Sequence, residues 1–137
     1  MAAMSDQLNE PLDDLASTAI PLVGARLEQV RVGYSVRLEF GDAGGVLIQT
    51  RFTCTIGGVS TEVDPETDLS GAGPLLGAMH TTLVAAFSDE HGALHLKLGT
   101  ETYVTVNPHQ KYEAWEFSST TLKIVSVPGG ELAVFKM

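Results

Sequence analysis

The sequence predicts an all-β domain built from antiparallel meanders. Apolar residues recur at every second position in several short stretches, glycine-rich turns separate these stretches, and little of the chain carries a helical pattern. Period two places successive side chains on opposite faces of a strand, so each stretch would bury one face. About nine such strands favour a sandwich or a partly open barrel. The alternative is an α+β domain, with helix in an N-terminal arm and in a central linker.

Residues 1–20 are expected to form an acidic N-terminal arm. Residues 21–137 are expected to form the β-rich domain as a single unit. Pro11 stands near the start of one or two potential helical turns, but the apolar content of the arm is thin. We therefore expect a frayed tail or a short helix laid over the domain, with Pro21 ending the segment.

The first part of the domain, residues 21–63, is predicted to form a three-stranded meander. From Val30 to Phe40 every even position is apolar or aromatic, although Gly33 could mark a bulge or a turn in this run. Alternation resumes after a glycine-rich turn. The dipeptide Gly57-Gly58 is typical of a two-residue hairpin turn into residues 59–63.

A second meander is expected over residues 74–106. Pro74-Leu75-Leu76-Gly77-Ala78 resembles Pro21-Leu22-Val23-Gly24-Ala25, and later glycine turns correspond in the same order, which suggests an internal duplication. Between the two meanders, residues 64–69 could begin a short helix, with Asp64 as N-cap and Pro65 at the first helical position.

The predicted C-terminal strands, residues 112–136, contain the clearest pattern of core-forming side chains. Trp115 and Phe117 alternate with smaller or charged neighbours, so both rings lie on one face. After a β-branched strand, Pro128-Gly129-Gly130 favours a type II turn, in which proline fixes the first central φ and glycine supplies the second. We expect Trp115 to pack in the core; the alternative is that it lines a ligand pocket.

The same C-terminal residues carry a family resemblance. Tyr112-Glu113-Ala114-Trp115, followed by Pro128-Gly129-Gly130-Glu131-Leu132-Ala133-Val134, resembles the signature of a family of small bacterial proteins known only as a domain of unknown function. The likeness extends back over most of the chain from Leu22. This resemblance implies a fold unit and a bacterial source, and it supplies no catalytic residue.

Composition narrows the class of protein. The chain has 137 residues, 44% of them hydrophobic, and a single cysteine, Cys54, which rules out an intrachain disulfide and a cysteine-based zinc cluster. The N-terminal residues have neither the basic nor the apolar region of a signal peptide, and no apolar stretch is long enough for a membrane span. We expect a soluble, cytoplasmic protein that does not enter a membrane.

The net charge of −9 is concentrated in two segments. Residues 1–20 and 60–70 each contain four acidic residues and no lysine or arginine, whereas the rest of the chain is nearly neutral. This distribution disfavours nucleic acid as a partner and suits a basic protein. The simpler interpretation is that the acidic segments keep the protein soluble.

Enzyme-like patterns are weak. His91 and His95 have the spacing of a helical zinc pair, but they fall in a predicted strand, where four residues span about 13 Å. Cys54 alternates in phase with apolar neighbours, which favours a buried structural thiol. His109, Tyr112 and Glu113 form the best cluster for catalysis. We expect no enzyme, no metal and no cofactor.

The leading hypothesis is therefore a non-enzymatic protein-interaction module that binds a basic protein, as an immunity protein binds a toxin. The candidate partner-binding residues are all acidic: Asp13, Asp14, Glu62, Asp64, Glu66 and Asp68. The alternative is a β-barrel that binds a small ligand in a pocket lined by aromatic residues, for which the candidates are Tyr34, Tyr103, Tyr112 and Trp115. A homo-oligomer is compatible with either hypothesis.

Overall fold

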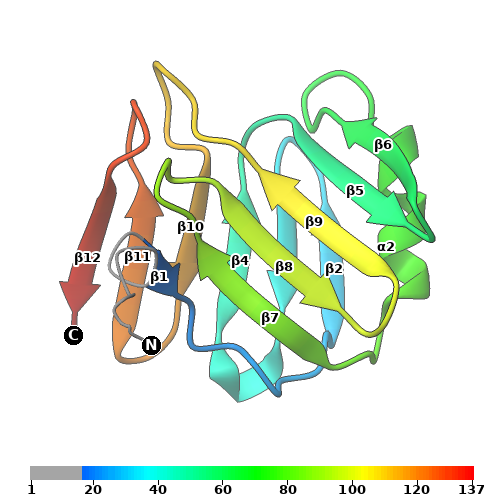
Figure 1. The fold of residues 1–137 in the computed structure, drawn as a ribbon, viewed down its shortest axis with the longest axis horizontal. Helices are drawn as coiled ribbons and strands as arrows, with labels where there is room; N and C mark the ends of the chain where they lie inside the picture. Colours follow the sequence, from blue (N-terminus) through cyan, green and yellow to red (C-terminus); the bar gives the residue numbers. More distant parts are fainter. Residues whose placement is uncertain (1–16) are drawn as a thin grey trace, which may run out of the picture.

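A computed structural model describes residues 17–137 as two six-stranded antiparallel sheets (Figure 1). The first sheet has the order β1 (Thr18–Ala19), β7 (Leu83–Ser88), β8 (Leu94–Leu98), β9 (Thr102–Val106), β5 (Phe52–Ile56) and β6 (Val59–Val63). The second has the order β12 (Leu132–Lys136), β11 (Leu122–Ser126), β10 (Trp115–Ser118), β4 (Gly45–Ile48), β3 (Val36–Glu39) and β2 (Gln29–Val32). Three short helical segments complete the described chain: η1 (Gly41–Ala43), η2 (Ser70–Ala72) and α2 (Gly73–Gly77).

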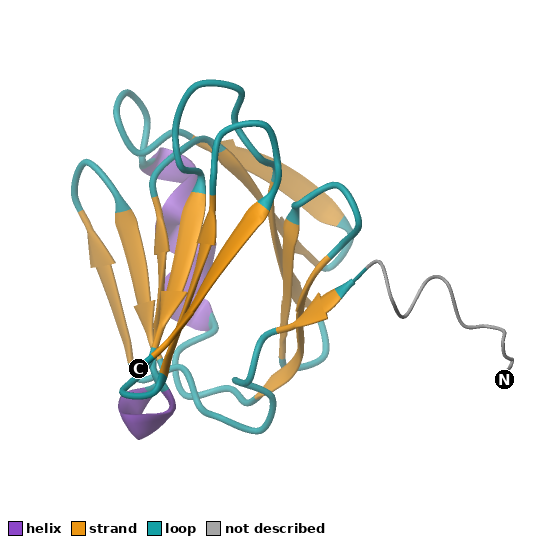
Figure 2. Cartoon of the chain, turned by 90° about the vertical axis from the view of Figure 1, so that its left-hand side faces the viewer, coloured by secondary structure: helices purple, strands orange, loops and turns teal. Residues whose placement is uncertain are grey.

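The two sheets face each other as a sandwich, which confirms the predicted all-β class (Figure 2). They do not close into a barrel, because each sheet ends at two edge strands. Side chains from both sheets fill the space between them, and Trp115 and Phe117 are fully buried there. Cys54 is also buried, as predicted, and this burial raises the pKa of its thiol.

A three-stranded meander lies in each sheet, β2–β3–β4 in the second and β7–β8–β9 in the first. The strand that follows each meander crosses to the opposite sheet: β5 after β4, and β10 after β9. The paired arrangement is compatible with the proposed duplication, which stays a hypothesis. The two crossing connections are important because they bring distant segments to the same end of the sandwich.

The hairpin turns have the predicted chemistry. Gly57 and Gly58 both have positive φ, 56° and 84°, which is the requirement of a type I′ turn between β5 and β6. Gly129 follows Pro128 with a φ of 93°, and the Gly130 N–H donates to the Val127 carbonyl at 3.1 Å, as a type II turn requires.

Three sequence-based expectations differ from the structure. The apolar run from Val30 to Phe40 is two strands, because the Gly33 N–H bonds to the Ser35 carbonyl and reverses the chain. Residues 64–69 form a turn; the helix α2 begins instead at Gly73, where Pro74 occupies the first turn. The last residues assigned to the arm belong to the domain, since β1 pairs with β7 and Ile20 is buried.

The described part of the chain contains one α-helix of five residues, so the α+β alternative is not the architecture seen. None of the described helices has the length and apolar character needed to cross a membrane.

Candidate functional site

Residues of three connections line a hollow of about 750 Å³. These connections gather at the upper end of the sandwich as drawn in Figure 1. The connections are the β4–β5 link, the turn after β6 and the β9–β10 loop, which come from well-separated parts of the sequence. We call this hollow the acidic groove. Its lining residues are Gln49, Thr50, Arg51, Asp64, Glu66, His109, Tyr112 and Glu113.

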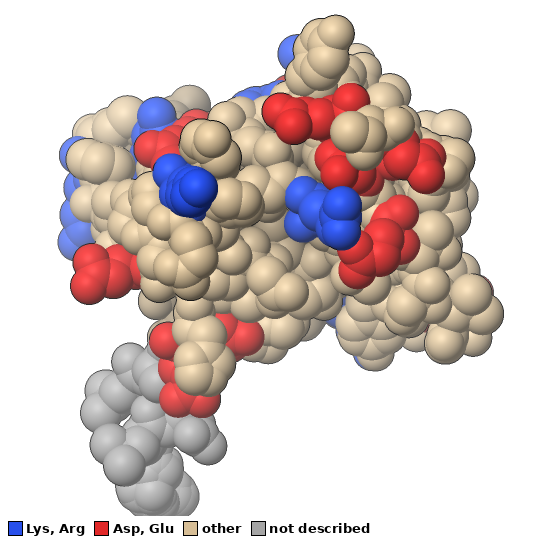
Figure 3. All heavy atoms as spheres, turned by 90° about the horizontal axis from the view of Figure 1, so that it is seen from above, with Lys and Arg blue, Asp and Glu red and all other residues tan. Residues whose placement is uncertain are grey.

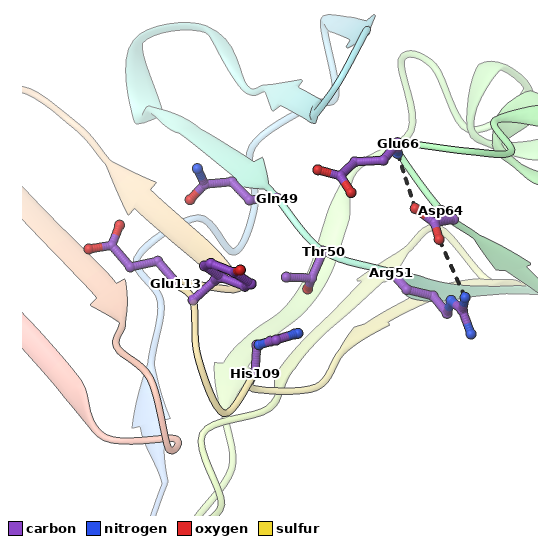
Figure 4. Close-up of a pocket in the computed structure, with 8 residues that line it drawn as sticks. Gln49, Thr50, Arg51, Asp64, Glu66, His109 and Glu113 are labelled. Carbon is purple, nitrogen blue, oxygen red and sulfur yellow. Dashed lines mark hydrogen bonds and ion pairs between the residues drawn. The ribbon is translucent and has the colours of Figure 1, made fainter.

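The carboxylates of the groove come from two of these connections (Figure 4). Asp64 is held in the turn after β6, where its Oδ1 accepts the Glu66 backbone N–H at 3.0 Å. This hydrogen bond is the main reason that the pKa of Asp64 lies below its usual value, so the carboxylate is charged at neutral pH. Glu66 and Glu113 lie on opposite sides of the groove, and neither forms an ion pair with a residue of the described chain.

Arg51 is the single lysine or arginine in the groove lining, and it is already paired. Its guanidinium lies 3.4 Å from Asp64 Oδ2 and 3.7 Å from Glu62 Oε1. The Arg51 side chain is 66% exposed, so these ion pairs are screened by water and add little to stability. They do, however, leave Glu66 and Glu113 as carboxylates without a cation in the groove.

The wall opposite Asp64 is aromatic. The rings of His109 and Tyr112 lie 5.0 Å apart, and the Lys111 backbone N–H donates to His109 Nδ1 at 3.0 Å. The Thr50 hydroxyl oxygen is buried and has no hydrogen-bond partner within the described residues. The groove therefore offers carboxylates and an aromatic wall to a ligand. Within residues 17–137, His109 forms no hydrogen bond with a hydroxyl group that could act as a nucleophile.

The structure brings together some of the predicted partner-binding residues. Asp64 and Glu66 line the groove, and Glu62 lies beside it through its contact with Arg51. Asp68 is nearby in the same turn, where the Ser70 hydroxyl donates to it at 2.6 Å and lowers the pKa of its carboxyl. Two further candidates, Asp13 and Asp14, lie outside the described residues.

The predicted aromatic pocket does not form within the described chain. Trp115 has no exposed surface, because it packs in the core. Tyr34 is 86% exposed and lies beside the turn after β6. Tyr103 lies on the outer face of the first sheet, where the centroid of its ring is 5.4 Å from Lys97 Nζ. Of the four candidates, Tyr112 lines the acidic groove.

The sequence did not reveal the contribution of Gln49, Thr50 and Arg51, which lie in a short link without a motif. It identified His109, Tyr112 and Glu113 as a cluster but gave no reason to place them beside Asp64. The missing information was the pair of crossings between the sheets, which brings both loops to one end. Within residues 17–137, no group of three or more His, Cys, Asp or Glu side chains is arranged to hold a metal ion.

Residues 18–136 match the sequence model of DUF6188, a family of unknown function. No curated protein and no solved structure matches the chain.

Proposed function

The chain belongs to the DUF6188 family, and from that premise we propose that it is a non-enzymatic interaction module that binds a basic protein through the acidic groove. The mode of binding would be that of an immunity protein, which neutralises a cationic surface of its target.

The observation that carries this proposal is the placement of Glu66 and Glu113. Both residues line the groove, from different loops, and the cation of the lining, Arg51, is paired with other acids. A lysine or arginine side chain of a partner would find two carboxylates whose charge no described residue neutralises. Charge-assisted hydrogen bonds of this kind are shorter and stronger than those between neutral groups.

The surface around the groove supports the same proposal. Viewed from this end of the sandwich, acidic side chains gather around a basic group, with the uncharged surface of the sheets beside them (Figure 3). Such a concentrated negative potential speeds the encounter with a basic protein and disfavours acidic partners. Tyr112, whose side chain is exposed, adds an aromatic face on which an arginine could stack.

The test is a capture experiment with matched variants. The immobilised protein is exposed to lysate of its source organism at low and high salt, and retained proteins are identified by mass spectrometry. Glu66→Gln/Glu113→Gln removes the two carboxylates and keeps Asp64, whose side chain holds the turn. Glu90→Gln/Glu101→Gln is the control, because it changes the net charge equally at exposed positions outside the groove.

The proposal predicts a basic protein that is retained at low salt by the wild type and by the control, but not by the groove variant. Equal retention by both double variants would show that the groove is not the binding site. Retention that does not depend on salt would contradict an electrostatic contact.

A small cationic ligand is a second candidate, favoured by the size of the groove. Its volume of about 750 Å³ lies within the range of small-molecule sites, about 300–1,000 Å³. A thermal-shift screen of amines and guanidinium compounds tests this candidate, since a ligand that binds the folded state raises the melting temperature. The Glu66→Gln/Glu113→Gln variant should lose any such shift.

A further inference from the structure

Strand β12 is the edge of the second sheet, and its outer side is unpaired among the described residues (Figure 1). β11 is its neighbour on the other side, in the register Val134↔Ile124. Two hydrogen bonds identify which residues face β11: Met137 N–H to the Thr121 carbonyl and Val127 N–H to the Glu131 carbonyl, both at 2.9 Å.

Hydrogen-bonded pairs alternate along an antiparallel ladder. Because positions 131 and 137 bond to β11, positions 133 and 135 do so as well, and the backbone groups of Leu132, Val134 and Lys136 point away from the sheet. This edge therefore presents three N–H and three C=O groups to another strand.

The other three edges of the described sandwich are shorter or protected. β1 has two residues, and β2 carries Arg31 in its centre. β6 is covered by η2, which approaches so closely that a Cβ on Gly71 would lie 2.7 Å from the Glu62 carbonyl oxygen. Natural proteins block exposed edges in these ways because an open strand pairs readily with another chain.

β12 has none of the usual protection in its centre. Val134 and Phe135 are each 52% exposed, and the strand contains no proline and no bulge relative to β11. Its single charged residue, Lys136, is at the end of the strand. The strand thus combines free backbone groups with exposed apolar side chains.

We propose that β12 pairs with β12 of a second copy of this chain, antiparallel and centred on Val134. This register uses all three outward-facing residues of each copy. Val134 would bond to Val134 of the other copy, and Leu132 to Lys136, so that six backbone hydrogen bonds join the two sheets.

The side chains fit this register. Phe135 of each copy would lie opposite Ala133 of the other, so a large residue meets a small one twice on the same face. The two Lys136 side chains would be separated by four residue positions, roughly 13 Å, which exceeds the screening length at physiological salt. The acidic grooves lie at a different part of the sandwich from β12, so dimer formation does not bring the acidic groups of the groove together at this contact.

The test is the molar mass in solution, measured by sedimentation over a dilution series. Wild type should sediment at twice the monomer mass of 14.5 kDa at high concentration and dissociate on dilution. Val134→Lys places two like charges opposite each other at the dimer axis and should give a monomer at every concentration. Val32→Lys is the matched control: an exposed valine (56%) on the other edge strand of the same sheet, whose replacement should leave the dimer intact.

Amide hydrogen exchange of the wild type tests the register without a variant. The amides of Leu132, Val134 and Lys136 should be protected at high concentration and lose protection on dilution, while those of Ala133 and Phe135 stay protected throughout. A wild-type monomer at the highest soluble concentration overturns the proposal. A dimer that survives Val134→Lys, or exchange at β12 that does not depend on concentration, also overturns it.

Discussion

The indole N–H of Trp115 donates a hydrogen bond to the carbonyl oxygen of Gly92 at 3.0 Å, from a strand of the second sheet to a turn of the first. Both residues are buried, so this bond satisfies a carbonyl group that water cannot reach. The tryptophan therefore joins the two layers of the sandwich at a defined point.

Trp115→Phe should lower the free energy of unfolding. The Gly92 carbonyl would be left unpaired, at a cost of about 1–3 kcal/mol, and the smaller ring would leave a cavity that adds to this loss. Urea unfolding measures the change. Tyr34→Phe, at a residue that is 86% exposed, is the control and should stay within about 0.5 kcal/mol of the wild type. A Trp115→Phe variant as stable as that control would contradict the role of the hydrogen bond.

Gly92 should not tolerate a side chain. It has a φ of 88°, and a Cβ at this position would overlap the carbonyl oxygen of Gly130. Gly129 has a similar φ of 93° but open space around it, so Gly129→Ala measures the conformational strain alone, about 1–2 kcal/mol. Gly92→Ala should cost about 1–3 kcal/mol more in the same urea experiment, because the Gly130 backbone must move. Equal losses of stability in the two variants would show that the loops of Gly92 and Gly130 can move apart without a cost in free energy.

The contrast between these two glycines illustrates what sequence alone could predict. Features that depend on neighbouring residues could be predicted: the type II turn at Gly129 follows from the Pro-Gly dipeptide, and the burial of Trp115 follows from the alternation of its strand. The contact between Gly92 and Gly130 joins turns far apart in the chain and depends on the packing of the two sheets. Nothing in the residue types around Gly92 specifies that partner.

The same distinction holds for the site. The acids of the turn after β6 and the cluster of His109, Tyr112 and Glu113 were identified separately from charge and residue type. Their convergence at one groove depends on the crossings β4–β5 and β9–β10, and strand periodicity does not determine which strands cross between sheets.

We expect Asp89 to make the free energy of unfolding depend on pH in the acidic range. Partial burial opposes its ionisation, but hydrogen bonds with His95 Nε2 at 2.7 Å and from the His91 and Ala93 N–H groups outweigh this effect and lower the pKa of the carboxyl. A carboxyl with a lower pKa in the folded than in the unfolded chain stabilises the fold above the unfolded value, about 3.9 for aspartate. That contribution is lost as the pH falls through the lower, folded-state pKa.

Asp89→Asn keeps the Oδ1 acceptor for the two backbone N–H groups and removes the charge. At pH 7 the variant should be less stable than the wild type by about 0.5–1 kcal/mol, since the Asp89 side chain is 32% exposed and the interaction is partly screened. The difference should shrink below about pH 4. Urea unfolding at several pH values measures it, with Glu90→Gln as the control, which should follow the wild-type profile. A difference that stays constant down to low pH would contradict the charge effect.

Arg51→Gln tests whether charge within the groove, rather than the total charge of the protein, governs binding under the proposed function. The substitution removes the cation of the groove lining and frees Glu62 and Asp64 to interact with a basic partner. The partner should therefore elute from the immobilised variant at higher salt than from the wild type. Arg26→Gln makes the same change in net charge at an exposed position outside the groove and should elute with the wild type. Equal shifts for both variants would mean that the partner responds to the overall negative charge, and earlier elution from Arg51→Gln would mean that Arg51 itself contacts the partner.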